Sequence, residues 1–215
     1  MPTQSRRRTN AVTAEAIAER RAEILDHTAD LIVEAGVAGC TFAAVSERSG
    51  FSIGMIQHYF RTRDRLVDAC IDHRLNVSEE QRKAIVARPG TPLERLRDLL
   101  DYAAGGDFAS GWGFWLELFN ASRLDDSLRE RVNERLLLWR QIFHDTLADV
   151  GETTRSTRSL DDVVASLLAL ADGLAIQVIN GTYGMTAERM RDLLAAFLAD
   201  QFGLPSDLPN GCQGA

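Results

Sequence analysis

Apolar side chains recur at spacings of three and four residues along most of the chain, which is the period of an amphipathic helix. The first such stretch runs from Ile17 to Ala35 and is closed by Gly36. Later stretches of the same period end at breaks rich in glycine or proline, near residues 88–90, 105–106 and 203–205. The alternating pattern that marks a half-buried strand does not occur in the sequence. The sequence therefore predicts an all-α protein of about nine helices.

Residues 41–65 predict two short helices joined by a tight turn. Thr41 is the expected N-cap of the first helix, because its hydroxyl can accept from a backbone N–H that has no partner within the helix. Gly50 ends this helix in the left-handed conformation, and Ser52 caps a second helix over residues 53–60. So short a turn brings the two helices together at a steep angle, as in a helix-turn-helix.

The second helix of the pair has one inward face and one uncommitted face. Ile56, Tyr59 and Phe60 lie within one stripe and are expected to face inward. The other side chains are free to face the major groove of DNA. We assign base reading to Ser52, Ile53, Met55, Gln57 and His58, and we count Gly54 among the DNA-binding residues.

Three arginines cluster where the next helix starts, at Arg61, Arg63 and Arg65. Cations at a helix N-terminus oppose the helix dipole by roughly 0.3–1 kcal/mol each, so they call for a compensating partner. A phosphate would satisfy both the backbone N–H groups and the guanidinium forks. The alternative is a solvated basic patch that Asp64 partly offsets. We assign phosphate contacts to Thr41, Tyr59, Arg61 and Arg63.

Residues 18–66 resemble the N-terminal domain of the TetR family of bacterial transcriptional regulators. The residues that match the family pattern are Thr41, Val45, Ser49, Gly50, Ser52, Gly54, His58, Tyr59, Phe60, Arg63 and Leu66. Gln57 departs from it, because the family has an aromatic residue in the middle of the recognition helix. Arg63 replaces the usual lysine, which keeps the charge and adds a bidentate donor. The run from Gln57 to Phe60 is similar to the branch that includes the betaine-pathway repressors, which implies a BetI-like C-terminal domain.

The chain is expected to have four segments. Residues 1–15 predict a flexible basic arm, which is either an ordinary loose terminus or a segment that enters a minor groove. Residues 16–65 form the helix-turn-helix DNA-binding domain, a bundle of three helices. Residues 66–203 form a helical ligand-binding and dimerisation domain, and residues 204–215 form a flexible tail.

The formal net charge of −7 is unevenly distributed along the chain. Residues 1–65 contain nine basic and eight acidic residues, a net of +1, whereas residues 66–215 contain 15 basic and 23 acidic residues, a net of −8. Because local charge governs contact with DNA, this acidity does not conflict with a DNA-binding head.

Enzymatic chemistry finds no support in the spacing of reactive residues. The four histidines are scattered, none stands at metal-ligand spacing from a cysteine or carboxylate, and no glycine-rich phosphate loop follows a strand. We therefore expect no catalytic residues, no metal and no cofactor. The four histidines are His27, His58, His73 and His144.

The predicted compartment is the cytoplasm. The three cysteines are odd in number and stand at no metal-ligand spacing, and no secretory start precedes the helical pattern. The longest apolar segment, residues 163–179, is interrupted by Asp172, Gly173 and Gln177, so we expect it to fall short of a membrane span.

The second part of the chain contains a candidate ligand site. Residues 111–119 include four aromatic side chains, more than one helix face needs, and two further aromatic residues stand one turn apart on a later helix. Apolar clefts between helices with a few polar groups are typical ligand sites. We assign ligand binding to Trp112, Trp115, Leu116, Phe119, Trp139, Phe143, Gln177 and Asn180. The alternative is that the aromatic residues are plain core.

One hypothesis concerns the ligand itself. If it is a quaternary ammonium compound, Trp112, Trp115 and Trp139 supply cation-π faces for it.

Two final helices, over residues 160–180 and 186–202, are apolar on more than one face and contain small residues that allow close packing. Two such helices from each subunit make a four-helix dimer interface, and the alternative is that one of them is the central core. We assign the interface to Val164, Leu168, Ala171, Ala175, Val178, Leu194, Phe197 and Leu198. A two-fold dimer reads an inverted repeat with recognition helices about 34–36 Å apart.

These expectations combine into one leading function. An unliganded homodimer binds a palindromic operator on double-stranded DNA as a repressor, and a small-molecule inducer of unknown identity releases it. The alternative is a helical ligand-binding or interaction protein whose DNA-binding head is degenerate.

Overall fold

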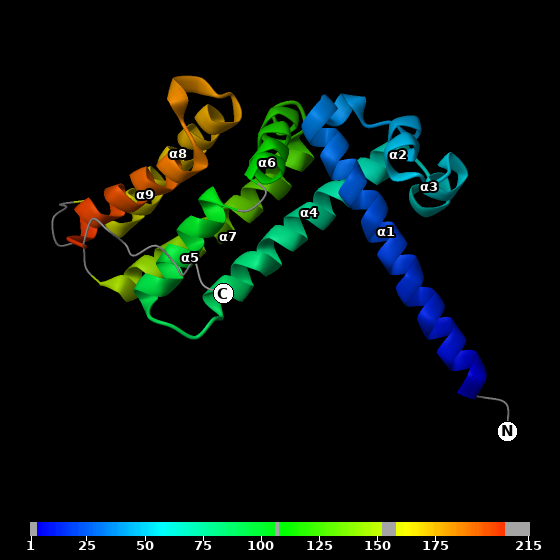
Figure 1. The fold of residues 1–215 in the computed structure, drawn as a ribbon, viewed down its shortest axis with the longest axis horizontal. Coiled ribbons are helices and arrows are strands. Elements are labelled where there is room, and N and C mark those ends of the chain that lie inside the picture. Colours follow the sequence, from blue (N-terminus) through cyan, green and yellow to red (C-terminus); the bar gives the residue numbers. More distant parts are fainter. Residues whose placement is uncertain (1–3, 106–107, 152–157, 205–215) are drawn as a thin grey trace. The chain divides into compact units, whose positions relative to one another are not determined.

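The computed structural model describes residues 4–105, 108–151 and 158–204, with side chains from residue 14 onward except that of residue 108. Within these residues it contains nine α-helices, one short 3-10 helix and no strand, so the all-α prediction is confirmed. The helices are α1 (Gln4–Gly39), α2 (Phe42–Ser49), α3 (Ile53–Phe60), α4 (Arg63–Val86), α5 (Pro92–Ala104), α6 (Phe108–Ser122), α7 (Asp126–Val150), α8 (Leu160–Ile179) and α9 (Ala187–Phe202) (Figure 1).

The chain divides into two compact units after Ser78, inside α4. Unit 1 comprises α1, α2, α3 and most of α4, and unit 2 comprises the rest of the chain. The boundary predicted from the sequence lies at residue 65, in the first turn of α4, and the functional roles of the segments stay predictions.

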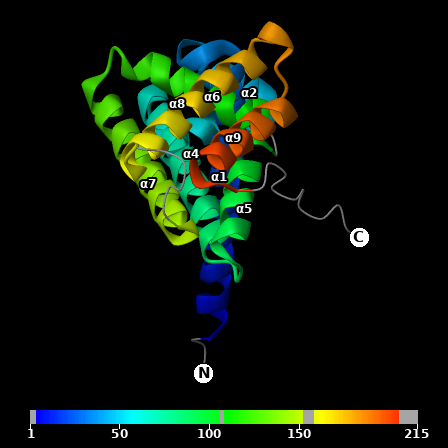
Figure 2. The same cartoon turned by 90° about the vertical axis from the view of Figure 1, so that its left-hand side faces the viewer.

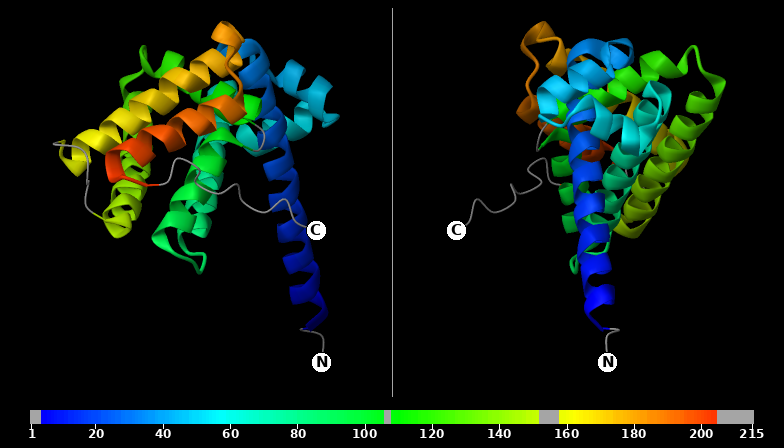
Figure 3. Two further views of the ribbon diagram at one scale, coloured as in Figure 1. Left: turned by 60° about the vertical axis from the view of Figure 1, so that its left-hand side comes forward. Right: turned by 90° about the vertical axis from the view of Figure 1, so that its right-hand side faces the viewer.

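Unit 1 is a small helical bundle in which α2 and α3 meet at an angle beside α1 (Figure 3). Side chains from all four helices fill its core, and the largest that are fully buried are Ile24, Leu25, Ile32, Ile56, Leu66 and Ile71. The thiols of Cys40 and Cys70 are buried here, and burial raises the pKa of both. They act as small core residues.

The helix-turn-helix has the caps that the sequence predicts. Thr41 accepts from the backbone N–H of Ala44 at 3.2 Å, and Ser52 accepts from that of Met55 at 3.3 Å. Gly50 has a φ of 74°, which places it in the left-handed region that favours glycine. Each cap satisfies a terminal N–H that would otherwise lack a partner.

α1 differs from its predicted start. It begins at Gln4, whereas we expected a loose arm up to residue 15. Hydrophobic periodicity reports which residues a helix buries, so it does not detect turns that continue beyond the core. At the other end the backbone leaves the helical region at Gly36, with a φ of 69°, before one further turn to Gly39.

Unit 2 packs α5, α7, α8 and α9 around a second core (Figure 2). Its fully buried members include Leu96, Leu99, Leu147, Val163, Val164, Ala175 and Leu198. α5 begins with a reciprocal capping box between Thr91 and Glu94, followed by Pro92 in the first turn. α8 and α9 lie side by side in both views (Figures 1 and 2).

Two helices of unit 2 differ from expectation. α6 continues through Gly111 and Gly113, although we expected a glycine-broken run. By length and composition alone α8 could cross a membrane, since its mean hydropathy is 1.8 over an 18-residue window. Asp172, Gly173 and Gln177 therefore do not make it too polar for a span, as we expected them to do. Core helices of soluble proteins pass the same test.

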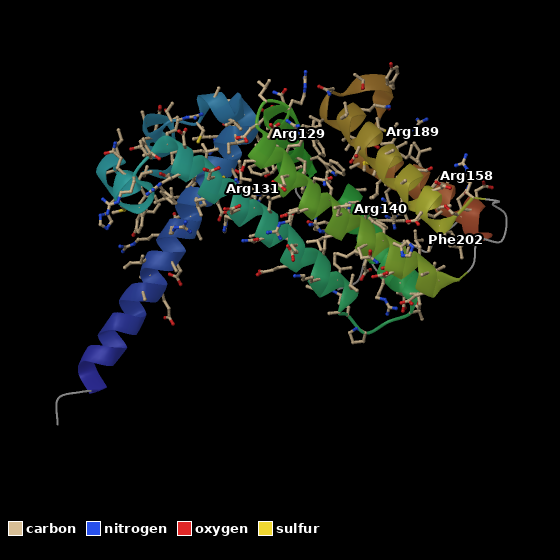
Figure 4. All side chains as sticks on the ribbon, turned by 180° about the vertical axis from the view of Figure 1, so that it is seen from behind. Arg129, Arg131, Arg140, Arg158, Arg189 and Phe202 are labelled. Carbon is tan, nitrogen blue, oxygen red and sulfur yellow. The ribbon has the colours of Figure 1, made fainter. Side chains whose placement is uncertain are left out.

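Several arginines of unit 2 are labelled in the view from behind, on α7, on α9 and just before α8 (Figure 4). Arg140 pairs with Asp161 at 3.0 Å, and Arg129 pairs with Asp126 and donates to the carbonyl of Ser122 at 3.2 Å. These two cations thus serve contacts within the chain.

Candidate nucleic-acid interface and effector site

The outer face of α3 is open. Ile53 and Met55 are 43% and 37% exposed although both are large and apolar, and Gln57 and His58 beside them are exposed as well. Gly54 lies on the same face, and a Cβ built on it meets no atom within 4 Å. The helix therefore presents a contiguous surface that no part of unit 1 covers.

The inner face of α3 is fixed. Ile56 is fully buried and Phe60 nearly so, as the predicted stripe requires, whereas Tyr59 is only half-buried. The guanidinium of Arg21 lies 5.1 Å from the centre of the Phe60 ring, which adds a cation-π contact from α1. The helix is thus anchored on one side and free on the other.

α2 is held to α1 by charge as well as by packing. Arg48 pairs with Glu34 at 2.6 Å and with Asp30 at 3.2 Å. Both acidic residues stand one turn apart on α1, so the single guanidinium spans them. Because all three groups are partly exposed, we expect this cluster to contribute orientation more than stability.

Arg63 has a partner that the sequence did not reveal. Its Nε donates to the carbonyl of Cys40 at 2.9 Å, and its Nη2 donates to the carbonyl of Val37. These carbonyls lie just at and beyond the end of α1, where a positive charge is favourable. For Arg63, these carbonyls therefore provide the compensating partner that we expected a phosphate to provide.

Arg61 is different, because its side chain is exposed and its backbone is strained. Its φ of 65° places a non-glycine residue in the left-handed half of the map, at the C-terminal end of α3. Such a conformation costs on the order of 1 kcal/mol or more and often occurs at functional sites. Thr41 is likewise exposed at the surface, so both remain candidates for phosphate contacts.

Three of the predicted ligand residues gather in unit 2. Phe143 is buried, Trp139 packs against it with ring centres 4.6 Å apart, and Trp112 packs on the same core. The Nε1 of Trp112 donates to the carbonyl of Ala103 at 2.7 Å. Tyr102 of α5, which we did not foresee, lies edge-on to Trp139 with ring centres 6.0 Å apart.

The other predicted ligand residues lie elsewhere. Trp115 and Phe119 pair with each other along α6, with ring centres 5.9 Å apart, and Leu116 is half-buried between them in sequence. Asn180 is exposed and its amide donates to the carbonyl of Ile176, so it caps the end of α8. Gln177 is half-buried on the last turn of that helix. The structure does not join these residues to the aromatic group around Trp139.

Arg82 is the residue of this region that sequence reasoning missed. It is 3% exposed, and its guanidinium lies 4.9 Å from the centre of the Trp139 ring. A signal was present, because Leu75, Arg82 and Ile85 fall on the same apolar stripe of α4. A charged residue at an inward position of a helix marks a place that needs an explanation.

Most of the residues predicted for the dimer interface face the core of the chain, and the interface itself stays a prediction. Val164, Ala171, Ala175, Leu194 and Leu198 are buried within the core of a single chain, so they are not accessible to a partner. Leu168, Val178 and Phe197 are half-buried against the same core. Both faces of α8 are apolar, so the sequence did not indicate which face turns inward. The exposed face of these helices contains Ala165, Ala169, Gly173, Ile176 and Leu193.

Asp172 gives a test of pH dependence. It is half-buried on α8, and burial raises the pKa of its carboxyl above the ordinary value. The folded chain therefore binds this proton more readily than the unfolded chain does, so stability falls as pH rises through the window above the ordinary pKa of about 3.9. We expect Asp172→Asn to raise the melting temperature by roughly 2–4 °C at pH 7.

The same variant is expected to melt nearly like the parent near pH 3.5, where the carboxyl is mostly protonated in both states. Thermal denaturation followed by circular dichroism at the two pH values measures the difference. An equal effect at both pH values would show that the charge of Asp172 is not responsible.

Comparison with known proteins covers both units. Residues 24–70 match the family model described as bacterial regulatory proteins of the tetR family, and residues 92–203 match the model described as the C-terminal domain of BetI-type transcriptional repressors. The HTH-type transcriptional regulator BetI of Burkholderia mallei is 34% identical over 165 residues, which cover 72% of this chain and 79% of the relative. BetI of Burkholderia cenocepacia is also 34% identical, over 164 residues.

Solved structures share the fold. A transcriptional regulator from Saccharomonospora viridis, in complex with choline, superposes with a TM-score of 0.75 at 24% identity and covers 84% of this chain and 96% of its own. FadR from Bacillus subtilis, in complex with stearoyl-CoA, superposes with a TM-score of 0.63 at 16% identity, over 83% and 97% of the two chains.

Proposed function

Because the chain belongs to the TetR family of bacterial transcriptional regulators and has a C-terminal domain of the BetI type, we propose that it is a cytoplasmic homodimeric repressor. In this proposal the dimer binds an inverted-repeat operator, and a small molecule held in unit 2 releases it. The proposal covers the form of the operator, the dimer and the direction of the response, which go beyond membership of the family.

The open face of α3 supports the DNA contact most directly. Two large apolar side chains, Ile53 and Met55, stay in water on a helix whose opposite face is firmly packed. Exposed apolar groups of this kind commonly mark an interaction site, and thymine methyl groups are apolar partners in the major groove. Gln57 and His58 beside them can form hydrogen bonds with base edges.

A dimer formed through α8 and α9 would use the face that the chain leaves open. Its small residues Ala165, Ala169 and Gly173 allow two helices to approach closely, and Ile176 is 45% exposed beside them. The core-facing residues that we first assigned to the interface would instead support it from behind. Two α3 helices about 34 Å apart would then reach successive major grooves.

The proposal is tested by the binding of purified protein to the DNA upstream of its own coding sequence. We expect footprinting to reveal two related half-sites and titration to give one dimer for each operator. A single protected half-site, or a monomer at full occupancy, would contradict the dimer, and no protection at any concentration would contradict the repressor.

The first matched pair of variants separates base reading from phosphate binding. Gln57→Ala is expected to lose discrimination at one or two base pairs, by about 1–3 kcal/mol, or roughly 5- to 160-fold, at each position. Arg61→Ala is expected to weaken binding to all sequences alike and to reduce the slope of log affinity against log salt by about 1. Fluorescence anisotropy on the operator and its single-base variants at several salt concentrations measures both effects. If Gln57→Ala weakened all sequences equally, Gln57 would have no reading role.

A further inference from the structure

The guanidinium of Arg82 is a buried positive charge without a counter-charge in the described part of the chain. The residue is 3% exposed and projects from the end of α4 into unit 2. Among the residues that the structure describes, its Nε has no hydrogen-bond partner, and no carboxylate forms an ion pair with it. Burial lowers the pKa of Arg82, which records the same cost of desolvation.

The described polar groups near Arg82 have other partners and do not balance its charge. Glu79, one turn earlier on α4, pairs instead with Lys83 and with Arg135 of α7. The hydroxyl of Tyr102 on α5 donates to the side-chain oxygen of Gln81 at 3.4 Å. A buried charge is normally paired or coordinated, because leaving it unpaired destabilises the folded state. No residue that the structure describes therefore supplies the partner of Arg82.

The Trp139 ring that a cationic ligand would need already contacts the Arg82 guanidinium. The Arg82 guanidinium lies 4.9 Å from the centre of the Trp139 ring, and Tyr102 and Phe143 lie in T-shaped arrangements with the same ring. A second positive charge at this ring would meet the first in a poorly solvated place, where like charges repel strongly. The quaternary ammonium hypothesis, in so far as it uses Trp139, conflicts with this arrangement.

We propose that the effector of this protein is an organic acid whose carboxylate binds Arg82. The guanidinium presents two parallel N–H groups along its Nε edge, which match the two oxygens of a carboxylate. The apolar part of the acid packs beside the aromatic side chains of α5 and α7. This inference rests on the proposed ligand response and specifies the charge of the ligand.

Four small molecules of similar shape show how much the cationic end and the carboxylate end of a ligand each contribute to binding. Glycine betaine has a trimethylammonium group and a carboxylate, and choline has the same cation with a hydroxyl. In 3,3-dimethylbutyrate and 3,3-dimethylbutan-1-ol a carbon atom replaces the nitrogen of each. Octanoate and octan-1-ol extend the comparison to a longer apolar part. Isothermal titration and thermal denaturation of the full-length protein measure binding.

We expect each carboxylate to bind the parent protein at least about 10-fold more tightly than its matched alcohol, since a hydrogen bond to a charged group is worth at least this factor. Arg82→Met keeps a long side chain over Trp139 and removes the charge, and it should lose this preference. Arg82→Lys keeps the charge without the fork and should retain part of it. Arg140→Met, next to Trp139 in sequence but paired with Asp161, is the control and should bind like the parent.

The melting temperatures of the same variants without ligand provide a second test. If Arg82 is kept for a ligand, Arg82→Met should melt at the same temperature as the parent or higher, because an uncompensated buried charge is removed. A markedly lower melting temperature would assign Arg82 a structural role and overturn the proposal. So would choline binding as tightly as glycine betaine, full carboxylate binding by Arg82→Met, or no binding of any carboxylate to the parent.

Operator binding by the unliganded protein is measured separately. Its absence would contradict the proposed repressor but would not change the comparison of carboxylates with alcohols. If the operator is bound and carboxylates bind only through Arg82, their ability to release the operator completes the proposed response.

Discussion

Replacing Gly54 by leucine is expected to abolish operator binding while the protein stays folded. Gly54 lies on the open face of α3, and a side chain added there meets no atom of the protein within 4 Å. A glycine inside an exposed helix costs about 0.5–1 kcal/mol relative to alanine, so its presence calls for a reason outside the fold. Close approach of the helix backbone to DNA is such a reason.

A graded series measures this effect. Gly54→Ala should raise the unfolding free energy by about 0.5–1 kcal/mol and weaken the operator complex moderately. Gly54→Leu should weaken it by about 3 kcal/mol or more, which is at least 100-fold in affinity, because the larger side chain holds the helix away from the groove. Chemical denaturation and fluorescence anisotropy give the two quantities for each variant.

Gly111→Ala is the matched control, because Gly111 is also a helical glycine with open space around it, in unit 2. It should gain similar stability and keep full DNA affinity. If Gly54→Leu also kept full affinity, α3 would not be the helix that enters the groove.

Replacing Arg63 by methionine is expected to destabilise unit 1. The substitution removes two charge-assisted donors to the carbonyls of Val37 and Cys40 at the end of α1. Such bonds contribute about 1.5–3 kcal/mol each when buried. Because the side chain is partly exposed and water can replace part of the loss, we expect a fall of about 2–4 kcal/mol. The melting temperature of a unit of this size would drop by roughly 8–30 °C.

Arg65→Met is the control for charge, because its side chain is exposed on the same turn of α4. It should change stability by less than about 0.5 kcal/mol. Arg63→Lys should fall between the two, since lysine lacks the fork that reaches both carbonyls. If Arg63→Met melted like the parent and lost only DNA affinity, Arg63 would be a phosphate contact as first predicted.

Local features of the fold were predictable from the sequence. The caps at Thr41 and Ser52, the left-handed Gly50 and the bounds of α3 follow from interactions between residues at most four apart. The stripe of Ile56 and Phe60 follows from helical periodicity, which needs no knowledge of the partner surface. The exposed face of α3 was therefore predictable as the remainder of the same helix.

Features that depend on distant segments were not predictable in this way. Arg63 meets carbonyls 23 and 26 positions earlier in the chain, and a sequence pattern does not reveal such a pairing. α8 is apolar on both faces, so its periodicity could not distinguish the core-facing Val164 from the exposed Ala165. Arg82 stood on an apolar stripe, but only the structure shows that no carboxylate of the described chain balances it.

The spacing between Ser52 and Ile56 has a consequence for changes in chain length. Ser52 fixes where α3 starts, and Ile56, four residues later, fixes which side of the helix meets the core. One residue inserted before Ser52 only lengthens the turn. One residue inserted between Ser52 and Ile56 turns the start of the helix by about 100° about its axis, relative to the buried side. Insertions at neighbouring positions thus differ sharply in outcome, because only the second rotates the start of α3, with its exposed side chains, relative to the buried side of the helix.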